Sequence, residues 1–519
     1  MDAAAELHQT ATDAALALRA LRRYPDRIAF RWDGGEMTYA ETEALIAGLQ
    51  VELKALGVGP EQAVAILSSN RVEAWCTVVA TQALGGAVSN LHPMASAEVH
   101  EAQIRELSPV VVVADDESHA ETAAALAKAL PDPAHLLLGG GETSLTARAR
   151  RHADAQVVNV GTPEMTATLN FTGGATGRPK KVVRTQGGVA AMTLSVLADY
   201  DLPKAPRFLA VAPISHVGGT KIVPTLLRGG MVRMVRGFDP ARVLELIEAE
   251  RISVALLAPT MIYALLDHPD VKTRDTSSLE LLLYGAAPMS PLRLKQGLDT
   301  FGPVFAQFYG QTECYPITFL PPEDHDPERP ELLMSCGRPV SQAQVKLLDP
   351  EGREVAQGEP GEICVRAPSA MTGYRDRHDE NLVALEGGWL HTGDIAVADA
   401  EGRLYIVDRK KDMIVSGGFN IYPKEVEDVL YAEESVAMCA VIGVPHDKWG
   451  EAVMAYVVPR AGATITAEQV TALVKEHKGA IQAPKAVEIV PDLPLTPLGK
   501  IDKVALRKPH WEGRERAVG

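Results

Sequence analysis

The stretch Phe171-Thr-Gly-Gly-Ala-Thr-Gly-Arg-Pro-Lys180 is the feature around which the rest of the chain is organised. Three glycines, two threonines and two basic residues occupy its ten positions. Glycine lacks a Cβ, so such a loop can turn several backbone N–H groups inward, and converging amides form a nest for anions. The preceding residues, 166–171, alternate as a strand does. The stretch therefore predicts a polyphosphate clamp at the end of a strand.

This loop differs from the P-loop of phosphotransferases, which requires G-x-x-x-x-G-K-[ST] leading into a helix. Here Gly173 is followed four residues later by Gly177, and Pro179 blocks a helix start of that kind. Glycine-rich turns are also common on protein surfaces. The loop alone therefore fits phosphate binding and a plain turn about equally well.

Composition limits the class of protein. The chain has 519 residues, a net charge of −16, 46% hydrophobic residues and 23% charged residues. One core rarely grows beyond ~250–300 residues, so two or three packed units are expected. The negative charge argues against a general nucleic-acid or anionic-membrane surface. No run of ~18 apolar residues predicts a membrane span, and no signal-peptide pattern is present.

The five cysteines are scattered, with no C-x-x-C pair among them. They are Cys76, Cys314, Cys336, Cys364 and Cys439. This distribution predicts reduced thiols in a cytoplasmic protein, with neither a disulfide framework nor a zinc site.

Apolar runs typical of buried strands alternate with helical patterns in the first part of the chain. Strands are expected at 63–67, 109–115, 207–212, 230–235, 253–258 and 279–284. Thr38-Tyr-Ala-Glu41 has the pattern of a capping box and is expected to open a helix that runs to Leu56. Such alternation predicts parallel sheets covered on both faces.

The pattern changes after about residue 330, where short alternating runs between turns predict a small β unit. From Arg409 helices and strands mix again. The expected fold class is α/β, with a large N-terminal domain of parallel-rich sheets flanked by helices at 1–408, including the β unit at about 331–408. A smaller, mobile α+β C-terminal domain is expected at 409–519.

Small and polar residues follow several of the expected strands, where open α/β sheets bind ligands. Tyr284-Gly-Ala-Ala-Pro288 offers a backbone on which a flat ring can lie. Tyr309-Gly-Gln-Thr-Glu313 offers an aromatic face, a hydroxyl and a carboxylate suited to Mg²⁺. Later turns present Gly393-Asp394, Asp408-Arg409 and Gly499-Lys500. Each of these segments, taken singly, is more often solvated surface than a site.

Taken together and in this order, the segments resemble the motifs of the adenylate-forming superfamily. That group contains acyl- and aryl-CoA synthetases, stand-alone adenylation domains and beetle luciferases. The resemblance covers nearly the whole chain, from Thr38 to Lys500. The Tyr-Gly-x-Thr-Glu and Gly-Asp…Asp-Arg elements at these spacings are its most specific part.

The resemblance implies an ATP-dependent acid–thiol ligase. A small-molecule carboxylic acid attacks the α-phosphate of Mg²⁺-ATP to give acyl-AMP and pyrophosphate, the small domain rotates, and the thiol of coenzyme A displaces AMP. The expected catalytic set is Lys500, Glu313, Thr172 and His216. Lys500 would bridge the carboxylate and the α-phosphate, where a preplaced cation lowers the barrier.

The remaining roles are also implied by the resemblance. The leaving phosphates would be held by Thr172, Gly173, Gly174, Thr176, Gly177 and Lys180. Adenine would be held by Gly285, Ala286, Ala287, Pro288, Gln307, Phe308, Tyr309 and Gly310. Thr312 would meet the α-phosphate, Glu313 the magnesium, and Asp394 and Arg409 the ribose. Lys411 matches the hinge, and Ser416, Gly417 and Gly418 would line the pantetheine tunnel.

The same resemblance implies the walls of the acid pocket: His216, Val217, Gly218, Lys221, Tyr284, Gly310, Cys314 and Tyr315. We expect His216 to pack beside the acyl site and gate it rather than to transfer protons. Lys221 follows His216 on an otherwise apolar stretch. It is expected to extend to solvent rather than to meet a polar group on the acid.

The chain departs from the usual motif, and two alternatives stay open. Gly173 and Ala175 replace hydroxyl residues, Lys181 replaces a glycine, and Arg184 stands where histidine is common. These changes allow a non-catalytic adenylate-binding protein. A phosphopantetheine on an acyl-carrier protein could replace coenzyme A as acceptor. The acid (aryl, carbocyclic or fatty) and the oligomeric state are not readable from the sequence.

Overall fold

The computed structural model describes residues 11–172, 179–287, 289–410, 412–416, 419–446, 448–460, 462–495 and 501–512. The chain divides into two compact units. The first unit comprises residues 1–345 and 365–390, and the second comprises residues 346–364 and 391–519. The predicted domain boundary near residue 408 stays a prediction. No helix in the described residues is long and apolar enough to cross a membrane.

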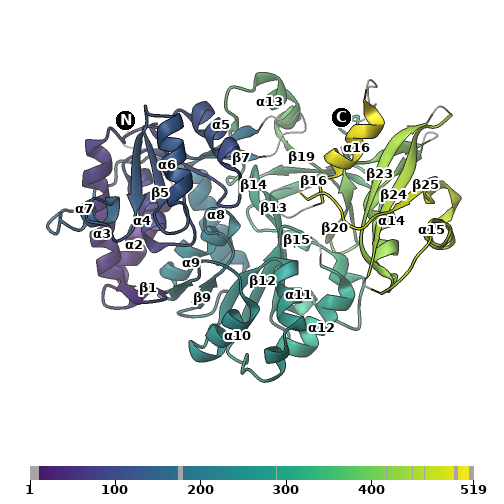
Figure 1. Cartoon of the computed structure of the whole chain (residues 1–519), viewed down its shortest axis with the longest axis horizontal. Helices are drawn as coiled ribbons and strands as arrows, with labels where there is room; N and C mark the ends of the chain where they lie inside the picture. The colour runs from purple at the N-terminus through teal and green to yellow at the C-terminus, as the bar shows by residue number, and fades with distance from the viewer. Residues whose placement is uncertain are drawn as a thin grey trace. The chain divides into compact units, whose positions relative to one another are not determined.

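The first unit contains two large sheets (Figure 1). One has the strand order β15-β14-β13-β12-β11-β9-β10-β1-β2. Its central neighbours pair in parallel, while β2, β14 and β15 pair antiparallel. Its strands are β1 (Ile28–Trp32), β2 (Gly35–Thr38), β9 (Arg207–Ala210), β10 (Met231–Met234), β11 (Val254–Leu257), β12 (Leu281–Gly285), β13 (Phe305–Gln311), β14 (Cys314–Leu320) and β15 (Arg338–Pro339).

The other sheet has the order β18-β8-β7-β4-β3-β5-β6, in which β8 and β18 pair antiparallel and the rest in parallel. Its strands are β3 (Ala63–Leu67), β4 (Ala87–Asn90), β5 (Val111–Asp115), β6 (Ala134–Leu138), β7 (Thr166–Thr172), β8 (Lys180–Thr185) and β18 (Gly373–Tyr374). The strand predicted before the glycine loop is confirmed as β7.

Helices cover both faces of these sheets because their apolar sides face the strands. The main core joins both sheets to α2 (Asp13–Arg23), α3 (Tyr39–Ala55), α4 (Val72–Ala83), α8 (Gln186–Asp199) and α9 (Ile222–Leu227). A second core packs α10 (Pro240–Ala249), α11 (Pro259–Asp267) and α12 (Pro291–Phe301) on the longer sheet. A third packs α5 (Ala97–Leu107) and α6 (Ala120–Ala129) on the shorter sheet. The unit is completed by α7 (Leu145–Ala149) and α13 (His378–Ala384).

The predicted capping box at the start of α3 is confirmed. The backbone N–H of Glu41 donates to Thr38 Oγ1 at 3.1 Å, and the backbone N–H of Thr38 donates to Glu41 Oε2 at 2.7 Å. Both bonds satisfy N–H groups that have no partner inside the helix.

The second unit contains two smaller sheets. The first has the order β16-β17-β19-β20, formed by β16 (Gln344–Leu348), β17 (Gly361–Arg366), β19 (Leu390–Ala398) and β20 (Leu404–Arg409). The second has the order β22-β21-β24-β23 with β25 beside β24, formed by β21 (Ile414–Ser416), β22 (Phe419–Ile421), β23 (Val436–His446), β24 (Gly450–Pro459) and β25 (Ala486–Ile489).

Helices α14 (Pro423–Tyr431) and α15 (Ala467–Gln482) share one core with this last sheet, and α16 (Lys503–Trp511) contributes to the core on its other face. The predicted α/β class, with a large sheet-rich N-terminal domain and a smaller C-terminal domain, is confirmed.

Candidate active site

Two segments predicted to hold phosphate lie side by side in the first unit. Thr172 ends β7 and Lys180 begins β8, and these two residues are antiparallel partners. The loop between them, with Gly173, Gly174, Thr176 and Gly177, lies outside the described residues. Lys180 places its ammonium 4.8 Å from the ring centroid of Tyr374. This cation–π contact holds the amine beside β18 (Gly373–Tyr374).

Tyr374 also reaches Glu313, the predicted magnesium ligand. The phenol donates to Glu313 Oε1 at 2.9 Å, and the Glu313 carbonyl accepts from the Met371 N–H at 2.6 Å. Glu313 is only 7% exposed. Burial, followed by the nearby carboxylate, raises the pKa of Tyr374 well above its ordinary value, so the phenol stays protonated as the donor.

Tyr374 is a site residue that the sequence reasoning missed. It stands in β18, which pairs with β8, so that Tyr374 lies opposite Val182. The pairing brings residue 374 to both Lys180 and Glu313. In the sequence, only the aromatic residue after Gly373 could have indicated a site here, and such a pair is too common to be specific.

The predicted adenine cradle lies on adjacent strands. Gly285 pairs with Phe308, and Tyr284 with Gln307. A Cβ on Gly285 would lie 2.5 Å from the Phe308 carbonyl oxygen, so only glycine fits there. Ala286 has a φ of 64° and, like Ala287, is exposed directly after β12. The strands thus bring Gly285 to Ala287 beside residues 307–310, while Pro288 lies outside the described residues.

Two more predicted nucleotide residues follow in the same segment. Tyr309, in β13, and Thr312, just after it, are both partly exposed. In the sequence they come shortly before Glu313, after the part of β13 that pairs with Tyr284 and Gly285. Their adenine and α-phosphate roles stay predictions.

His216 begins the group of residues predicted for the acid pocket. Its ring centroid is 4.7 Å from that of His92, and its Nδ1 lies 2.8 Å from Ser215 Oγ. Desolvation by the surrounding protein, with His92 second, lowers the pKa of His216 to about 4, although part of the side chain remains exposed. The imidazole is therefore neutral at pH 7. Val217 and Gly218 follow it in the 3₁₀ turn η1 (Val217–Lys221).

The expectation that Lys221 extends to solvent is wrong. Its side chain is 0% exposed, because Lys221 ends η1 and is enclosed rather than lying on the outer face of a long helix. Nζ donates to Thr220 Oγ1 at 2.7 Å and to the hydroxyl of Tyr315. Desolvation lowers the pKa of Lys221 well below its ordinary value.

Aromatic rings enclose the Lys221 amine. Nζ lies 4.6 Å from the ring centroid of Tyr315, 5.2 Å from that of Tyr200 and 5.3 Å from that of Phe308. The hydroxyls of Tyr200 and Tyr315 are 3.1 Å apart. We refer to Tyr200, Lys221, Phe308 and Tyr315 as the aromatic cage.

Other residues predicted for the acid pocket divide between two places. Gly310 touches the cage, since a Cβ there would lie 2.9 Å from Tyr315 Cδ2 and 2.9 Å from the Cys314 carbonyl oxygen. The Cys314 thiol is 3.8 Å from Ser369 Oγ. Tyr284 instead faces the second core, where its hydroxyl is 3.0 Å from His325 Nε2. The structure therefore does not group Tyr284 with the cage.

Two of the residues that depart from the usual motif, Lys181 and Arg184, make contacts with distant parts of the first unit. Lys181 donates to the Glu106 carbonyl at 3.0 Å and pairs with Asp376 at 3.2 Å. Arg184 is buried and donates to the Ser369 carbonyl at 3.1 Å and the Tyr315 carbonyl at 3.4 Å. Both cations are thus engaged in tertiary contacts of the first unit.

The predicted ribose pair lies in the second unit. Asp394 and Arg409 are cross-strand partners on β19 and β20, with Arg409 Nε 3.4 Å from Asp394 Oδ1. Asp394 is 8% exposed. The Gly393 N–H donates to Glu362 Oε1 at 3.0 Å, which holds the turn before Asp394. Glu362 is a further residue that the sequence reasoning did not single out.

Asp408, beside Arg409, gives the second unit a pH-dependent stability. Its side chain accepts from the Arg409 N–H at 2.6 Å and the Lys424 N–H at 2.8 Å and is 6% exposed. Burial raises the pKa of Asp408 from 3.8 to about 6, with Lys503 acting in the opposite direction. Folding therefore favours the protonated carboxyl. This contribution is fully present below pH 3.8 and is lost as pH rises through about 6.

We expect Asp408→Asn to remove about 1–3 kcal/mol of the change in unfolding free energy between pH 4 and pH 7.5. The measurement is denaturant unfolding of both proteins across that pH range. A variant whose stability has the same pH slope as the wild type would exclude Asp408 as the group responsible.

Of the remaining predicted residues, only Ser416 belongs to the described part of the chain. Ser416 ends β21, is 8% exposed and pairs with Phe419 and Gly450. Lys411, Gly417, Gly418 and Lys500 lie outside the described residues. Their hinge, tunnel and bridging roles stay predictions.

Comparisons with known proteins agree with this fold. The family model of the AMP-binding enzyme matches residues 18–375, and that of the AMP-binding enzyme C-terminal domain matches residues 425–500. The chain is 42% identical to a medium/long-chain-fatty-acid–CoA ligase of Mycobacterium tuberculosis, over 97% of this chain and 91% of that protein. It is 37% identical to a feruloyl-CoA synthase of an Amycolatopsis species, over 95% of this chain and 97% of that protein.

Among solved structures, the amide bond synthetase McbA from Marinactinospora thermotolerans is similar, with a TM-score of 0.87 and 33% identity over 96% of this chain and 99% of that chain. The chain belongs to the AMP-binding enzyme family. Within it, the chain is an AMP-forming acid–thiol ligase, as the resemblance implied.

Proposed function

We propose that this enzyme activates an aromatic carboxylic acid with ATP and transfers the acyl group to coenzyme A. A carboxylate oxygen attacks the α-phosphorus, and pyrophosphate leaves. The thiol sulfur then attacks the acyl carbon, the thiol proton is lost, and AMP leaves with the oxygen that joined the two groups. The aromatic cage is the observation that carries the choice of acid.

The residues in place fit Mg²⁺ as the metal that accompanies ATP. Magnesium is commonly held by one or two carboxylates together with substrate phosphates. Glu313 supplies a buried carboxylate, and the phenol of Tyr374 fixes its orientation. The ion would neutralise phosphate charge, while Lys180 and Thr172 would bind the leaving phosphates from the adjoining strands. In the second unit, Asp394 and Arg409 would bind the ribose hydroxyls, and Lys500 would bridge the two reacting groups.

The cage favours a ring over a plain chain. Gly310 is partly exposed and lies against the Tyr315 ring edge, and we expect an aromatic acid to pack edge to face at this place. Such contacts contribute about 0.5–1.5 kcal/mol each beyond the burial of area. The amine of Lys221 donates to the Tyr315 hydroxyl and holds it in place, which gives an oxygen-bearing ring a polar group to approach. A fatty acyl chain gains neither contact.

The rival acid is a medium- or long-chain fatty acid, which the Mycobacterium tuberculosis relative favours. The test is pyrophosphate release with benzoate, ferulate, indoleacetate, octanoate and palmitate at saturating ATP. The edge-to-face contact and the polar contact with Tyr315 together predict that kcat/KM for the best ring acid exceeds that for octanoate by about tenfold. A higher kcat/KM for octanoate would contradict the aromatic assignment.

A matched variant isolates the cage. Tyr315→Leu should reduce the preference for ring acids about three- to tenfold while the KM for ATP stays unchanged. Leu keeps an apolar side chain there, so equal losses for ring and chain acids would show a structural role only.

The acceptor is tested separately from the acid. The first step would be run to acyl-AMP, and then free coenzyme A, a carrier protein bearing phosphopantetheine, or a simple amine would be added. The proposal expects the fastest consumption of acyl-AMP with coenzyme A. Preference for the carrier would support the alternative that the sequence left open, and preference for the amine would match the amide bond synthetase.

A further inference from the structure

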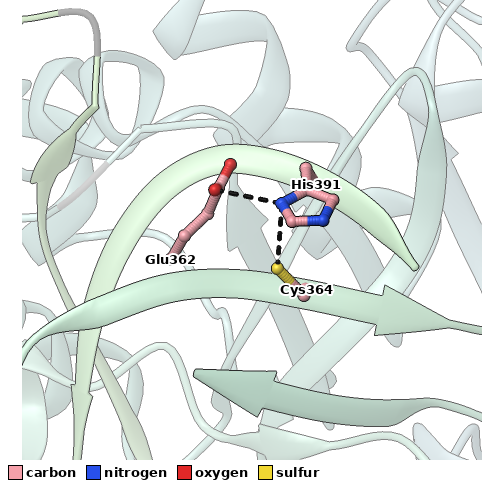
Figure 2. Close-up of side chains that lie close together, drawn as sticks. All are labelled: Glu362, Cys364 and His391. Carbon is pink, nitrogen blue, oxygen red and sulfur yellow. Dashed lines mark hydrogen bonds and ion pairs between the residues drawn. The ribbon is translucent and has the colours of Figure 1, made fainter. Parts of the chain in front are cut away.

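A group of three side chains that could ligate a metal lies in the second unit, and none of the three is assigned to ATP or to the acid. Figure 2 shows Glu362, Cys364 and His391 pointing toward one another from neighbouring strands. Their ligand atoms all lie within 4.8 Å of one another. Among the described residues, no other group of three His, Cys, Asp or Glu side chains meets that criterion.

The sheet explains the convergence. Residues i and i+2 of a strand point to the same face, so Glu362 and Cys364 of β17 stand side by side. His391 is on β19, the next strand of the sheet, and Thr392 Oγ1 donates to the Ile363 carbonyl at 2.8 Å, which ties the two strands together. The three ligands are therefore fixed by backbone pairing.

The distances suit a tetrahedral ion. His391 Nδ1 lies 3.1 Å from Glu362 Oε2 and 3.3 Å from Cys364 Sγ. Zinc with Zn–S near about 2.3 Å and Zn–N or Zn–O near about 2.0 Å separates its ligand atoms by roughly 3.3–3.6 Å. The ligand atoms of Glu362 and Cys364 lie within 4.8 Å of each other, so this pair would close by up to about 1 Å on coordination.

Lys410 is the present cationic partner of this group. Its Nζ lies 3.0 Å from Glu362 Oε2, the same oxygen that faces His391. The lysine side chain is 52% exposed, whereas that of Glu362 is 8% exposed. The ammonium can therefore move into solvent, while the carboxylate cannot.

We propose that Glu362, Cys364 and His391 form a binding site for Zn²⁺, and that the ion replaces Lys410 as the partner of Glu362 Oε2. One thiolate, one neutral imidazole and one carboxylate carry two negative charges, which balance the ion. The thiol proton of Cys364 passes to solvent on binding, and a water completes four ligands. This proposal differs from the expectation, drawn from the cysteine spacing, that the chain has no zinc site.

The site is connected to the proposed ribose turn within the same unit. Glu362 Oε1 accepts from the Gly393 N–H, next to Asp394, and the Lys410 N–H donates to the Gly393 carbonyl at 2.8 Å. A metal on Glu362 would thus adjoin the backbone that positions Asp394.

The first test uses Co²⁺ as a spectroscopic probe of the full-length enzyme, with Zn²⁺ as competitor. The proposal expects one Co²⁺ per chain, a thiolate-to-cobalt charge-transfer band, and loss of that band when one equivalent of Zn²⁺ is added. Cys364→Ser and His391→Ala should weaken binding at least tenfold. Cys439→Ser, which changes another buried cysteine of the same unit, should leave the band intact.

A second variant keeps the test decisive if changes at Cys364 disturb folding. Lys410→Met removes the competing cation from a half-exposed position, so it should tighten Co²⁺ and Zn²⁺ binding by roughly threefold or more. An absent charge-transfer band in the wild type, a band that survives Cys364→Ser, or weaker binding in Lys410→Met would overturn the proposal.

Discussion

Glu313→Gln is expected to lower the rate of pyrophosphate release by about 10²–10³-fold at saturating ATP and acid. Glu313 is buried, and its carboxylate is oriented by Tyr374, which also contacts Lys180. The amide keeps the size of the side chain and an oxygen that can accept from Tyr374, but it removes the negative charge that a divalent cation needs. The loss should therefore be specific to the metal-dependent step.

The control is Tyr374→Phe, which keeps the carboxylate and removes the hydroxyl that orients it. It should raise the Mg²⁺ concentration for half-maximal activity and lower kcat by about 10- to 100-fold, since one hydrogen bond to a charged group contributes about 1.5–3 kcal/mol. If Glu313→Gln keeps wild-type turnover and Mg²⁺ dependence, Glu313 is not the metal ligand.

Lys500→Ala should separate the two half-reactions. The transition state of the first step gathers negative charge on phosphoryl oxygens, and removing a preplaced cation should slow adenylate formation by about 10²–10³-fold. Thioester formation from supplied acyl-AMP does not need that cation and should stay within about threefold of the wild type.

The readouts are pyrophosphate release from acid and ATP, and acyl-CoA formation from synthetic acyl-AMP. Lys503→Ala is a nearby control, because Lys503 pairs with Glu427 at 2.8 Å within the C-terminal part and has no proposed catalytic role. Equal losses in both half-reactions for Lys500→Ala would point to damage of the fold rather than to a role in the first step.

Local sequence rules predicted the parts of this protein that depend on neighbouring residues. The strand before the glycine loop and the capping box of Thr38 and Glu41 follow from short patterns, and the structure confirms both. The Asp394 and Arg409 motifs were found by their spacing. Their cross-strand contact then follows from the pairing of β19 with β20.

Other features depend on pairings that no single sequence window contains. Tyr374 reaches Glu313 only because β18 adds to β8. Lys221 is enclosed by rings from three separate segments, so a rule about solvent-reaching lysines did not apply. The side chains of Glu362 and Cys364 show the two-residue period of a strand. Their proximity to His391 requires knowing that β17 and β19 are neighbours.

The transfer of oxygen from the acid to AMP tests the central claim most directly. The enzyme would be supplied with a carboxylic acid labelled with ¹⁸O in its carboxylate, together with ATP and coenzyme A. The ¹⁸O content of the AMP, the pyrophosphate and any inorganic phosphate would then be measured by mass spectrometry. Attack of the carboxylate on the α-phosphorus predicts AMP that carries one ¹⁸O atom and pyrophosphate that carries none. Unlabelled AMP, or label in pyrophosphate or inorganic phosphate, would contradict an acyl-adenylate intermediate.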